Sequence, residues 1–406
     1  MRILAANCGS STLKFKLIEV GNEGASPNQG SVTAVGSVER IGGRQPAVDF
    51  SSENGECLQQ PTDIKDHDAA IRCVFDWLRS THLVGPDGPE AVGHRIVHGG
   101  DRFSEPALIE AETMDAIESL VELAPLHNGP SLAAIRAARE VLNSSVPMVA
   151  VFDTAFHSTL PEHAAQYAIP KDLADRHGIR RYGFHGIAHR YMTERYAAIT
   201  GTSVERVKLV TLQLGNGCSA TAVRDGRSVD TSMGFTPLEG LMMGTRSGNI
   251  DPFLVGFLSR QENVDVEEVE RWLNTRSGLL GVSGISRDVR ELLEAEARGE
   301  TRAALALEMF CYQIRKYVGA YITALGGADA VIFGGGIGEN APQVRARICA
   351  DMDWCGLVLD LERNARTIGS EDQISTEDSS VHAHVVSVDE EMMIAHDTAN
   401  YLQKVG

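Results

Sequence analysis

Short apolar runs rich in β-forming residues open the chain and predict strands. They cover Arg2 to Ala6, Leu13 to Val20, Ser31 to Val38 and Ala47 to Phe50, and glycine-containing turns separate them. Consecutive strands joined by short turns usually pair in opposite directions. The pattern therefore predicts a sheet that begins antiparallel.

The hydrophobic positions then change to a helical period. Asp68 to Arg79 and Ser131 to Leu142 both show this period. In the first of these segments, the apolar positions on one face are Ile71, Val74, Phe75 and Leu78. Strands return at Ala91 to Val97 and Met148 to Phe152. Strands that alternate with helices predict an α/β fold.

The second half of the chain repeats the order of the first. Its pieces are a strand at Val207 to Leu214, a polar turn at Gly215 to Ser219, a strand at Ala220 to Arg224 and a hairpin turn at Asp225-Gly226, and helices follow. Asn7 and Asn216 occupy matching places in the two copies, about half the chain apart. We predict a duplicated α/β fold with a cleft between the copies.

Two features predict the domain limits. The strand that ends at Phe152 gives way to a polar segment at Asp153, and a last helical segment runs from about Glu390 to Leu402. Its apolar spacing suits packing against the first half. We expect a first domain of residues 1–153, completed by a helix over 390–406, and a second domain of residues 154–389.

Composition narrows the class of protein. Of the 406 residues, 43% are apolar, which is enough for sizeable cores. The net charge of −18 argues against broad binding to nucleic acids or anionic membranes, which need a basic surface. No basic leader or long apolar run is found, so we expect a cytoplasmic protein. Seven cysteines without a C-x-x-C pair indicate neither a zinc site nor a disulfide framework.

Two polar turns between strands carry the first functional signal. The turn in Asn7 to Lys14 and the turn at Gly215 to Ser219 combine glycine with hydroxyl-bearing residues. Backbone N–H groups and hydroxyls gathered in this way suit phosphate oxygens, and Lys14 can pair with a transferring phosphoryl group. A tight hairpin that needs Gly9 is the alternative explanation of the first turn. Together, the turns favour a nucleotide-dependent phosphotransferase.

A third glycine-rich segment lies near the end of the chain. A buried-type strand at Ala330 to Phe333 runs into Gly334 to Asn340, and Pro342 can begin a helix. Gly336 to Ala341 fits the dinucleotide pattern G-x-G-x-x-A, but it lacks the early βαβ position of that motif. We interpret it as part of a nucleotide site that uses all three glycine-rich segments.

Four polar residues are candidates for the chemical step. Arg95 and Arg246 lie in glycine-punctuated segments and could clamp a carboxylate or phosphoryl group with two hydrogen bonds. Asp153 follows an apolar strand, a frequent place for catalytic groups, and His185 lies between glycines. Each also has a structural explanation: a surface ion pair for Arg95, a pair with Asp251 for Arg246, a helix cap or an arginine partner for Asp153, and a packed ring for His185.

With these segments in order, the chain resembles the acetokinase family from end to end. The matching motifs are N-x-G-S-S-T-L-K at Asn7 to Lys14, V-G-H-R-I-V-H-G-G at Val92 to Gly100, A-P-L-H-N at Ala124 to Asn128, F-D-T-A-F-H at Phe152 to His157, Y-G-F-H-G at Tyr182 to Gly186, L-G-N-G at Leu214 to Gly217, M-G-T-R-S-G at Met243 to Gly248, G-G-G-I-G-E-N at Gly334 to Asn340 and D-E-E at Asp389 to Glu391.

The resemblance implies the two-domain fold of sugar kinases, heat-shock ATPases and actin, with a nucleotide cleft between the domains. It also implies reversible phosphoryl transfer between ATP and a short-chain carboxylate, which gives an acyl phosphate and ADP. Acetate is the expected carboxylate and propionate the alternative. The resemblance further implies a homodimer that uses Mg²⁺, or Mn²⁺ in its place.

The resemblance implies a role for each matching residue. Asp153 would be the catalytic acid, and His185 and Arg246 would stabilise the transition state. Arg95 would bind the carboxylate or the acyl phosphate. Val97, Leu126 and Pro237 are the candidates for the acyl pocket by family position, and packing in the core is the alternative explanation for them. Asn7 and Glu390 would help to hold the metal. The nucleotide would contact Lys14, Gln213, Leu214, Gly215, Asn216, Gly217, Asp288, Val289, Arg290, Gly336, Ile337, Gly338, Glu339 and Asn340.

Three positions depart from the family pattern. Gln213 replaces a histidine, Thr12 a serine and Asp389 an asparagine. Glutamine keeps a hydrogen bond but not an imidazole charge, so nucleotide affinity or its pH response can change. A carboxylate at Asp389 can tighten or displace the metal.

Other functions fit parts of this sequence. An ATP-driven switch could share the fold, but it would not need Arg95, Asp153, His185 and Arg246 together. A sugar or glycerol kinase would need a strong base, whereas a carboxylate is already ionised at pH 7. We therefore expect direct attack by the carboxylate, with Asp153 orienting the acceptor side.

Overall fold

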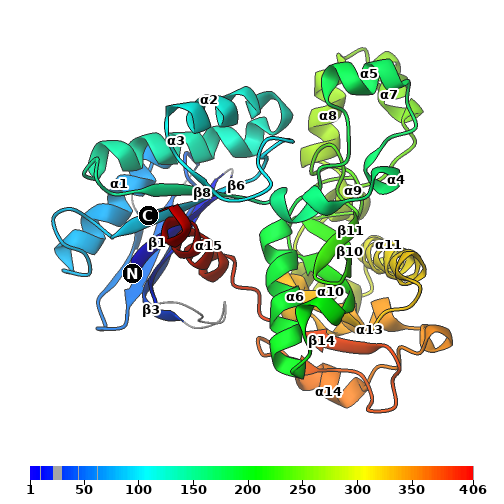
Figure 1. Ribbon diagram of the computed structural model, residues 1–406. Helices are drawn as coiled ribbons and strands as arrows, with labels where there is room; N and C mark the ends of the chain where they lie inside the picture. The colour runs from blue at the N-terminus through cyan, green and yellow to red at the C-terminus, as the bar shows by residue number, and fades with distance from the viewer. Residues whose placement is uncertain (10, 22–29, 44, 62, 406) are drawn as a thin grey trace. The chain divides into compact units, whose positions relative to one another are not determined.

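Two mixed β-sheets, each with its own helices, organise the computed structural model (Figure 1). The structure describes residues 1–9, 11–21, 30–43, 45–61 and 63–405. The chain divides into two compact units, Met1–Ala155 with Asp389–Gly406, and Phe156–Val388. The nucleotide cleft between the two halves stays a prediction.

The sheet of the first unit has eight strands in the order β5-β4-β3-β2-β1-β6-β8-β7. Strands β1 to β5 pair antiparallel in sequence, whereas β6 runs parallel to β1 and β8 parallel to β6. The antiparallel start of the sheet is confirmed. The strands are β1 (Arg2–Cys8), β2 (Thr12–Val20), β3 (Gly30–Glu39), β4 (Ala47–Ser52), β5 (Cys57–Pro61), β6 (Ala91–Ile96), β7 (Ala107–Leu108) and β8 (Met148–Phe152).

Helices cover both faces of this sheet (Figure 1). Val92 belongs to the core that contains the buried side chains of α1 and α3, whereas a Cβ on Gly93 would meet Ile394 and Thr398 of α15. Neighbouring strand residues point to opposite faces, so α15 packs on the face away from α1 and α3. The helices are α1 (His67–Ser80), α2 (Ala111–Ser119), η1 (Val121–Leu123), α3 (Pro125–Val141) and α15 (Glu390–Val405).

The sheet of the second unit has six strands in the order β11-β10-β9-β12-β14-β13. Here β9, β10 and β11 pair antiparallel, and β12 and β14 follow in parallel. The first unit has the same order and directions in β3-β2-β1-β6-β8, so the predicted duplication is confirmed. The strands are β9 (Lys208–Leu214), β10 (Cys218–Arg224), β11 (Arg227–Thr231), β12 (Ala330–Gly334), β13 (Asp372–Gln373) and β14 (His382–Val385).

Most helices of the chain belong to the second unit. They are η2 (Ala155–Thr159), which spans the division between the units, α4 (Glu162–Ala165), α5 (Lys171–His177), α6 (Gly186–Thr200), η3 (Val204–Arg206), α7 (Phe253–Glu262), α8 (Val266–Thr275), α9 (Gly278–Ser283), α10 (Val289–Ala297), α11 (Thr301–Leu325), α12 (Gly335–Asn340), α13 (Pro342–Cys349), η4 (Asp353–Cys355) and α14 (Leu361–Arg366). None of the described helices combines the length and the apolar composition that crossing a bilayer requires.

Local expectations were right at one hairpin turn and wrong at one helix start. The predicted hairpin at Asp225-Gly226 is present, with φ of +52° and +74°. Helix α3 begins at Pro125 instead of Ser131, because it continues through Pro130. The helical period used for the prediction was clear only from Ser131 onward, and the first turns before Pro130 were not recognised.

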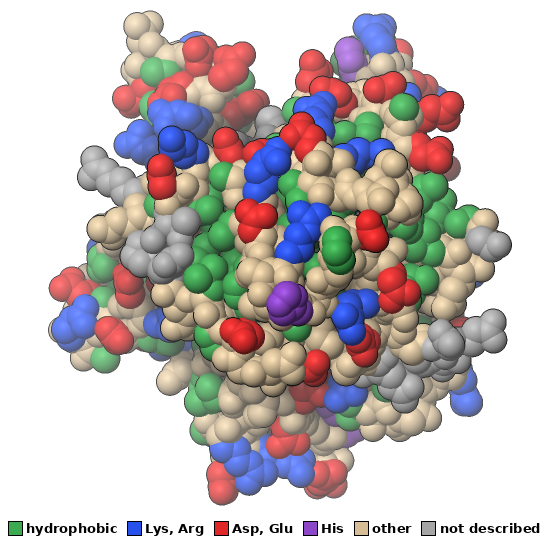
Figure 2. All heavy atoms as spheres, turned by 90° about the vertical axis from the view of Figure 1, so that its left-hand side faces the viewer, with side chains coloured by type: hydrophobic (Ala, Val, Ile, Leu, Met, Phe, Trp, Pro, Cys, Tyr) green, Lys and Arg blue, Asp and Glu red, His purple; other side chains and the backbone are tan. Residues whose placement is uncertain are grey.

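Charge on the surface is mixed. Figure 2 shows acidic and basic side chains interspersed over one face, with apolar patches between them. The acidic excess of the sequence is therefore spread among basic groups on this face.

Candidate active site

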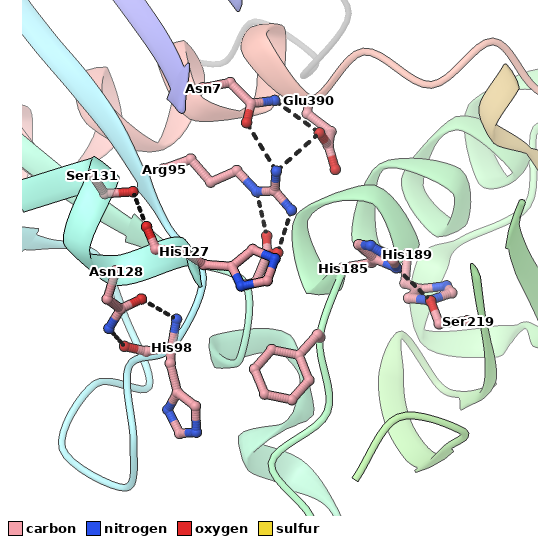
Figure 3. Close-up of polar contacts among 12 residues, drawn as sticks. Asn7, Arg95, His98, His127, Asn128, Ser131, His185, His189, Ser219 and Glu390 are labelled. Atoms are coloured by element: carbon pink, nitrogen blue, oxygen red, sulfur yellow. Dashed lines mark hydrogen bonds and ion pairs between the residues drawn. The ribbon is translucent and has the colours of Figure 1, made fainter. Parts of the chain in front are cut away.

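Arg95 and Asp153 form a buried ion pair at the ends of two parallel strands (Figure 3). Arg95 lies on β6, and Asp153 follows β8, where its backbone N–H donates to Ile96 O at 2.9 Å. The guanidinium donates from Nε to Oδ1 at 3.1 Å and from Nη2 to Oδ2 at 2.5 Å. Asp153 is fully buried, so its charged carboxylate is removed from water. The two hydrogen bonds from Arg95 compensate the free-energy cost of that burial.

The free edge of the same guanidinium reaches Asn7. Arg95 Nη1 donates to Asn7 Oδ1 at 2.9 Å, and Asn7 Nδ2 donates to Glu390 Oε2 at 2.9 Å and Glu391 Oε1 at 3.0 Å. Burial opposes the charge of Arg95, but Asp153 and Glu390 outweigh it and raise its pKa. Burial, followed by repulsion from Glu390, raises the pKa of Glu391. The structure thus brings Asn7, Arg95, Asp153 and Glu390 into one group.

Asp389 has a defined place beside this group. Its carboxylate pairs with Lys16 Nζ at 2.6 Å and accepts the backbone N–H of Met392 at 2.9 Å. It therefore caps α15 and neutralises a lysine. Lys14 is exposed on β2 opposite Asn7 in the ladder, so its side chain leaves the sheet on the same face.

The predicted acyl pocket is only partly described. Val97 is buried just beyond β6, and Pro237 lies in the second unit. Leu126 lies in α3, but its side chain falls outside the described part of the chain. Figure 3 shows the ring of His127 directed toward Arg95. Sequence reasoning assigned no role to His127, although the A-P-L-H-N motif contains it.

His185 is held by a chain of buried polar side chains in the second unit (Figure 3). Its Nδ1 lies 2.9 Å from Ser219 Oγ, which lies 2.7 Å from His189 Nε2, and His189 Nδ1 lies 2.8 Å from Thr211 Oγ1. Burial holds the pKa of His189 well below its usual range, so this ring is neutral. His185 itself has φ of +57°, a left-handed conformation that is uncommon outside glycine.

Arg246 approaches the same place from another loop. Its Nη1 donates to Pro237 O at 2.9 Å. A Cβ on Gly217 would lie 3.3 Å from His185 Cε1 and 3.5 Å from Arg246 Nη2. Burial lowers the pKa of Arg246, and no carboxylate hydrogen bond is recorded for it among the described residues. Gly217, His185 and Arg246 therefore converge.

The predicted phosphate turn connects these groups. Gly215 N donates to Gly217 O at 3.0 Å, and Gly244 N donates to Asn216 O at 3.1 Å, which ties the turn after Leu214 to the Arg246 loop. Gln213 lies opposite Ser219 in the β9–β10 ladder. Its Oε1 is buried without a hydrogen-bond partner among the described residues, so it can accept a hydrogen bond from a ligand.

The remaining predicted nucleotide residues form two groups. Gly336, Ile337, Gly338, Glu339 and Asn340 lie in the short helix α12, where an open glycine segment was expected. Glu339 Oε1 accepts the backbone N–H of Gly335 at 3.0 Å. Asp288 caps α10, the helix that begins at Val289, and pairs with Arg290 at 2.6 Å.

The donor set at Asn7 and Glu390 suits Mg²⁺. Amide and carboxylate oxygens are the ligands that Mg²⁺ prefers, and it is commonly bound by one or two carboxylates together with substrate phosphates. Within the described residues, no group of three His, Cys, Asp or Glu side chains is arranged to hold a metal. A metal here would depend on substrate oxygens for further ligands.

Comparisons with known proteins agree with one another. The model of the Acetokinase family matches residues 2–396. An acetate kinase of Solibacter usitatus is 47% identical over 98% of this chain and 97% of its own length. Among solved structures, an acetate kinase of Porphyromonas gingivalis has a TM-score of 0.89 at 41% identity, covering 99% of both chains. A propionate kinase of Francisella tularensis has a TM-score of 0.89 at 39% identity, covering 98% of this chain and 99% of its own. By its sequence and its fold, the chain belongs to the acetokinase family.

Proposed function

We propose that this protein is an acetate kinase, which transfers the terminal phosphoryl group of ATP reversibly to acetate and forms acetyl phosphate and ADP. The convergence of His185 and Arg246 on Gly217 carries the proposal, because phosphoryl transfer requires positive groups and hydrogen-bond donors around one point. The acetate kinases among its relatives support the same reaction.

In this proposal, one pair of residues binds the carboxylate that accepts the phosphoryl group, and a second pair stabilises the phosphoryl group during transfer. Arg95 binds the carboxylate of acetate, and Asp153 fixes the orientation of that guanidinium. The carboxylate is already ionised at pH 7, so its oxygen attacks phosphorus directly and no side chain removes a proton. His185 and Arg246 stabilise the charge on the transferring oxygens.

The nucleotide belongs to the second domain in this proposal. Residues 154–389 bind ATP through the turn at Gln213 to Gly217, the start of α10 and helix α12. Residues 1–153 and the helix over 390–406 bind the acyl group, while Lys14 reaches the phosphates. Oε1 of Gln213, which has no hydrogen-bond partner among the described residues, gives the turn a neutral acceptor for the nucleotide.

Asn7 and Glu390 would hold Mg²⁺, or Mn²⁺ in its place. When bound, the metal supplies charge that neutralises the phosphate oxygens. Asp389 does not compete directly, since Lys16 neutralises its carboxylate.

Propionate is the second candidate substrate. The similar propionate kinase of Francisella tularensis favours it, and a small apolar pocket separates substrates that differ by one methylene by only about 1–3 kcal/mol. The relatives at higher identity are acetate kinases, which favours acetate.

One assay tests all these readings. The protein is incubated with ATP, Mg²⁺, hydroxylamine and a panel of carboxylates and polyols, and acyl phosphate is trapped as hydroxamate. We expect hydroxamate with acetate and less with propionate. ATP hydrolysis without hydroxamate indicates a switch, and ADP release that depends on a polyol indicates a sugar or glycerol kinase.

We also propose that two copies of the chain associate. Helix α11 exposes Leu305, Met309 and Tyr312 along one stripe, and α7 exposes Phe253 and Phe257. Exposed apolar stripes of this kind are typical of surfaces that another protein covers. A homodimer that functions in the cytoplasm agrees with the family resemblance.

A further inference from the structure

The carbonyl that holds Arg246 belongs to a segment without helix or strand. Arg246 Nη1 donates to Pro237 O, and Pro237 lies between the end of β11 at Thr231 and the glycine turn at Gly240. Such a segment has no ladder of its own to fix its carbonyls. Its position therefore depends on side chains as well as on a few backbone hydrogen bonds to neighbouring segments.

Arg181 supplies most of that support. Its Nη1 donates to the carbonyls of Thr231, Ser232 and Met233 at 3.2, 3.3 and 3.2 Å, and its Nη2 donates to Glu239 Oε1 at 2.8 Å. One guanidinium therefore reaches both ends of the segment. Burial alone would lower the pKa of Arg181, but Glu239 outweighs burial and raises it, so the group keeps its charge.

Tyr167 contacts both Glu239 and the backbone of the same segment. Its hydroxyl donates to Glu239 Oε2 and accepts the backbone N–H of Phe235 at 2.7 Å. A Cβ on Gly234 would overlap both the Glu239 carboxylate and the Tyr167 hydroxyl. The glycine therefore leaves the space in which the two side chains meet. We name Arg181, Glu239 and Tyr167 the Arg181 brace.

The same segment also reaches His185. Gly234 O accepts the backbone N–H groups of Tyr182 and Gly183 at 3.1 and 3.3 Å. These two residues lead directly to His185, whose left-handed backbone needs fixed surroundings. Pro237 at one point and Gly234 at another thus connect one segment to both Arg246 and His185.

We propose that Arg181, Glu239 and Tyr167 are positioning residues, which act through the 231–239 segment to hold Arg246 and His185 in the geometry that the phosphoryl group requires. The proposal rests on the proposed function, because it assigns a purpose to a cluster that need not touch substrate. A misplacement of about 1 Å in such groups costs about 10²-fold in rate.

Two substitutions test the brace with little change in shape. Tyr167→Phe removes the hydroxyl and keeps the ring, and Glu239→Gln removes the charge. We expect each to lower kcat for acetate about tenfold and to leave the KM for ATP within about twofold, since the nucleotide contacts stay in place. Glu371→Gln is the matched control, because Glu371, like Glu239, pairs with an arginine and is similarly buried. It should keep wild-type kcat.

A double-mutant cycle separates positioning from general damage. Because the brace acts through both Arg246 and His185, Tyr167→Phe should cause a smaller loss of kcat in an Arg246→Ala background than in the wild type. A loss that is as large in that background as in the wild type would overturn the proposal. Thermal melting of each variant shows whether it is folded.

A crystal structure of Tyr167→Phe gives a readout that is independent of turnover. We expect the hydrogen bond between Arg246 Nη1 and Pro237 O to be broken or displaced. An unchanged Arg246 in this variant and in Glu239→Gln would overturn the brace, whatever the activity. Wild-type protein that fails to phosphorylate acetate would contradict the proposed function alone, and the crystallographic comparison would still decide the brace.

Discussion

Two arginines of the candidate site have opposite surroundings. Arg95 is compensated by the fully buried Asp153, which fixes its direction at the cost of part of its attraction for a substrate anion. Arg246 is held by the carbonyl of Pro237, and burial lowers its pKa. A buried guanidinium held in this way keeps a strong attraction for phosphoryl oxygens, which supports the proposal that Arg246 stabilises the transition state and Arg95 orients the substrate.

Replacement of Arg246 by alanine should therefore lower kcat more than it changes ATP binding. We expect a loss of at least about 10²-fold, as for the removal of a donor aimed at developing charge. The hydroxamate assay measures the effect. Arg136→Ala, which removes an exposed ion pair with Glu118, serves as the control. Turnover within a few-fold of the wild type would exclude Arg246 from the chemical step.

A buried histidine makes stability depend on pH. Burial, with help from Arg139, lowers the pKa of His94 to about 3, whereas the unfolded chain has a value of about 6.5. The unfolded state therefore binds the proton first as the pH falls. The stabilising contribution is complete above about pH 6.5 and is lost as the pH falls toward about 3, by about 1.4 kcal/mol per unit for this group.

His94→Leu should accordingly reduce the loss of stability between pH 7 and pH 5. Urea unfolding of the wild type and of His94→Leu at both pH values measures this loss of stability. Comparing the two pH values within each protein removes the effect of the substitution on packing. His177→Leu, at an exposed position on α5, should behave like the wild type. An equal loss of stability in His94→Leu and the wild type would show that His94 is not the group responsible.

Among the elements, the junction of β12 and α12 depends on a glycine. Gly335 has φ of +75°, and a Cβ there would lie 2.7 Å from Leu214 O, at the end of β9. The strand and helix can approach the phosphate turn this closely only because position 335 has no side chain. The junction therefore sets the distance between two of the proposed nucleotide segments.

Gly335→Ala should raise the KM for ATP by at least about tenfold, because helix α12 must move away from the turn after Leu214. Gly319→Ala is the matched control, since a Cβ at this position inside α11 would meet no described atom within 4 Å beyond its own stretch of helix. We expect the control to keep its activity and to gain about 0.5–1 kcal/mol of stability. ATP titrations and thermal melts test both, and an unchanged KM in Gly335→Ala would refute the role of the junction.

At the scale of the whole molecule, both units use the same strand order, while apolar side chains on α7 and α11 remain exposed. A symmetric pair of chains would cover such surfaces, because the same patch serves both partners. The exposed stripe on α11 has the spacing of one helix face, which suits contact with a second helix.

Light scattering should therefore give twice the mass of one chain. Charge placed on the stripe by Met309→Asp should shift the protein to the monomer, since an unpaired charge opposes burial. Leu361→Asp, at another exposed apolar position on α14, should leave the dimer intact. A wild-type protein that is monomeric at micromolar concentration would contradict the proposal.

The sequence by itself determined the local pieces and the family. The β8 strand, the hairpin at Asp225-Gly226 and the start of α15 at Glu390 lie where the pattern predicted. These features depend on residues close in sequence, whose conformational preferences act before the chain is folded. The short edge strands β5 and β7 were missed, because so few residues carry no clear period.

Only the tertiary structure decided which side chains meet. Asn7 contacts Glu390 across 383 positions, Asp389 turned out to pair with Lys16, and the Arg181 brace joins three segments that share no motif. Strand register and helix packing determine these contacts. Neither can be predicted from the spacing of residues that are close in sequence. The motifs thus identify which chemical groups are present, whereas packing between distant segments determines the direction in which each side chain points.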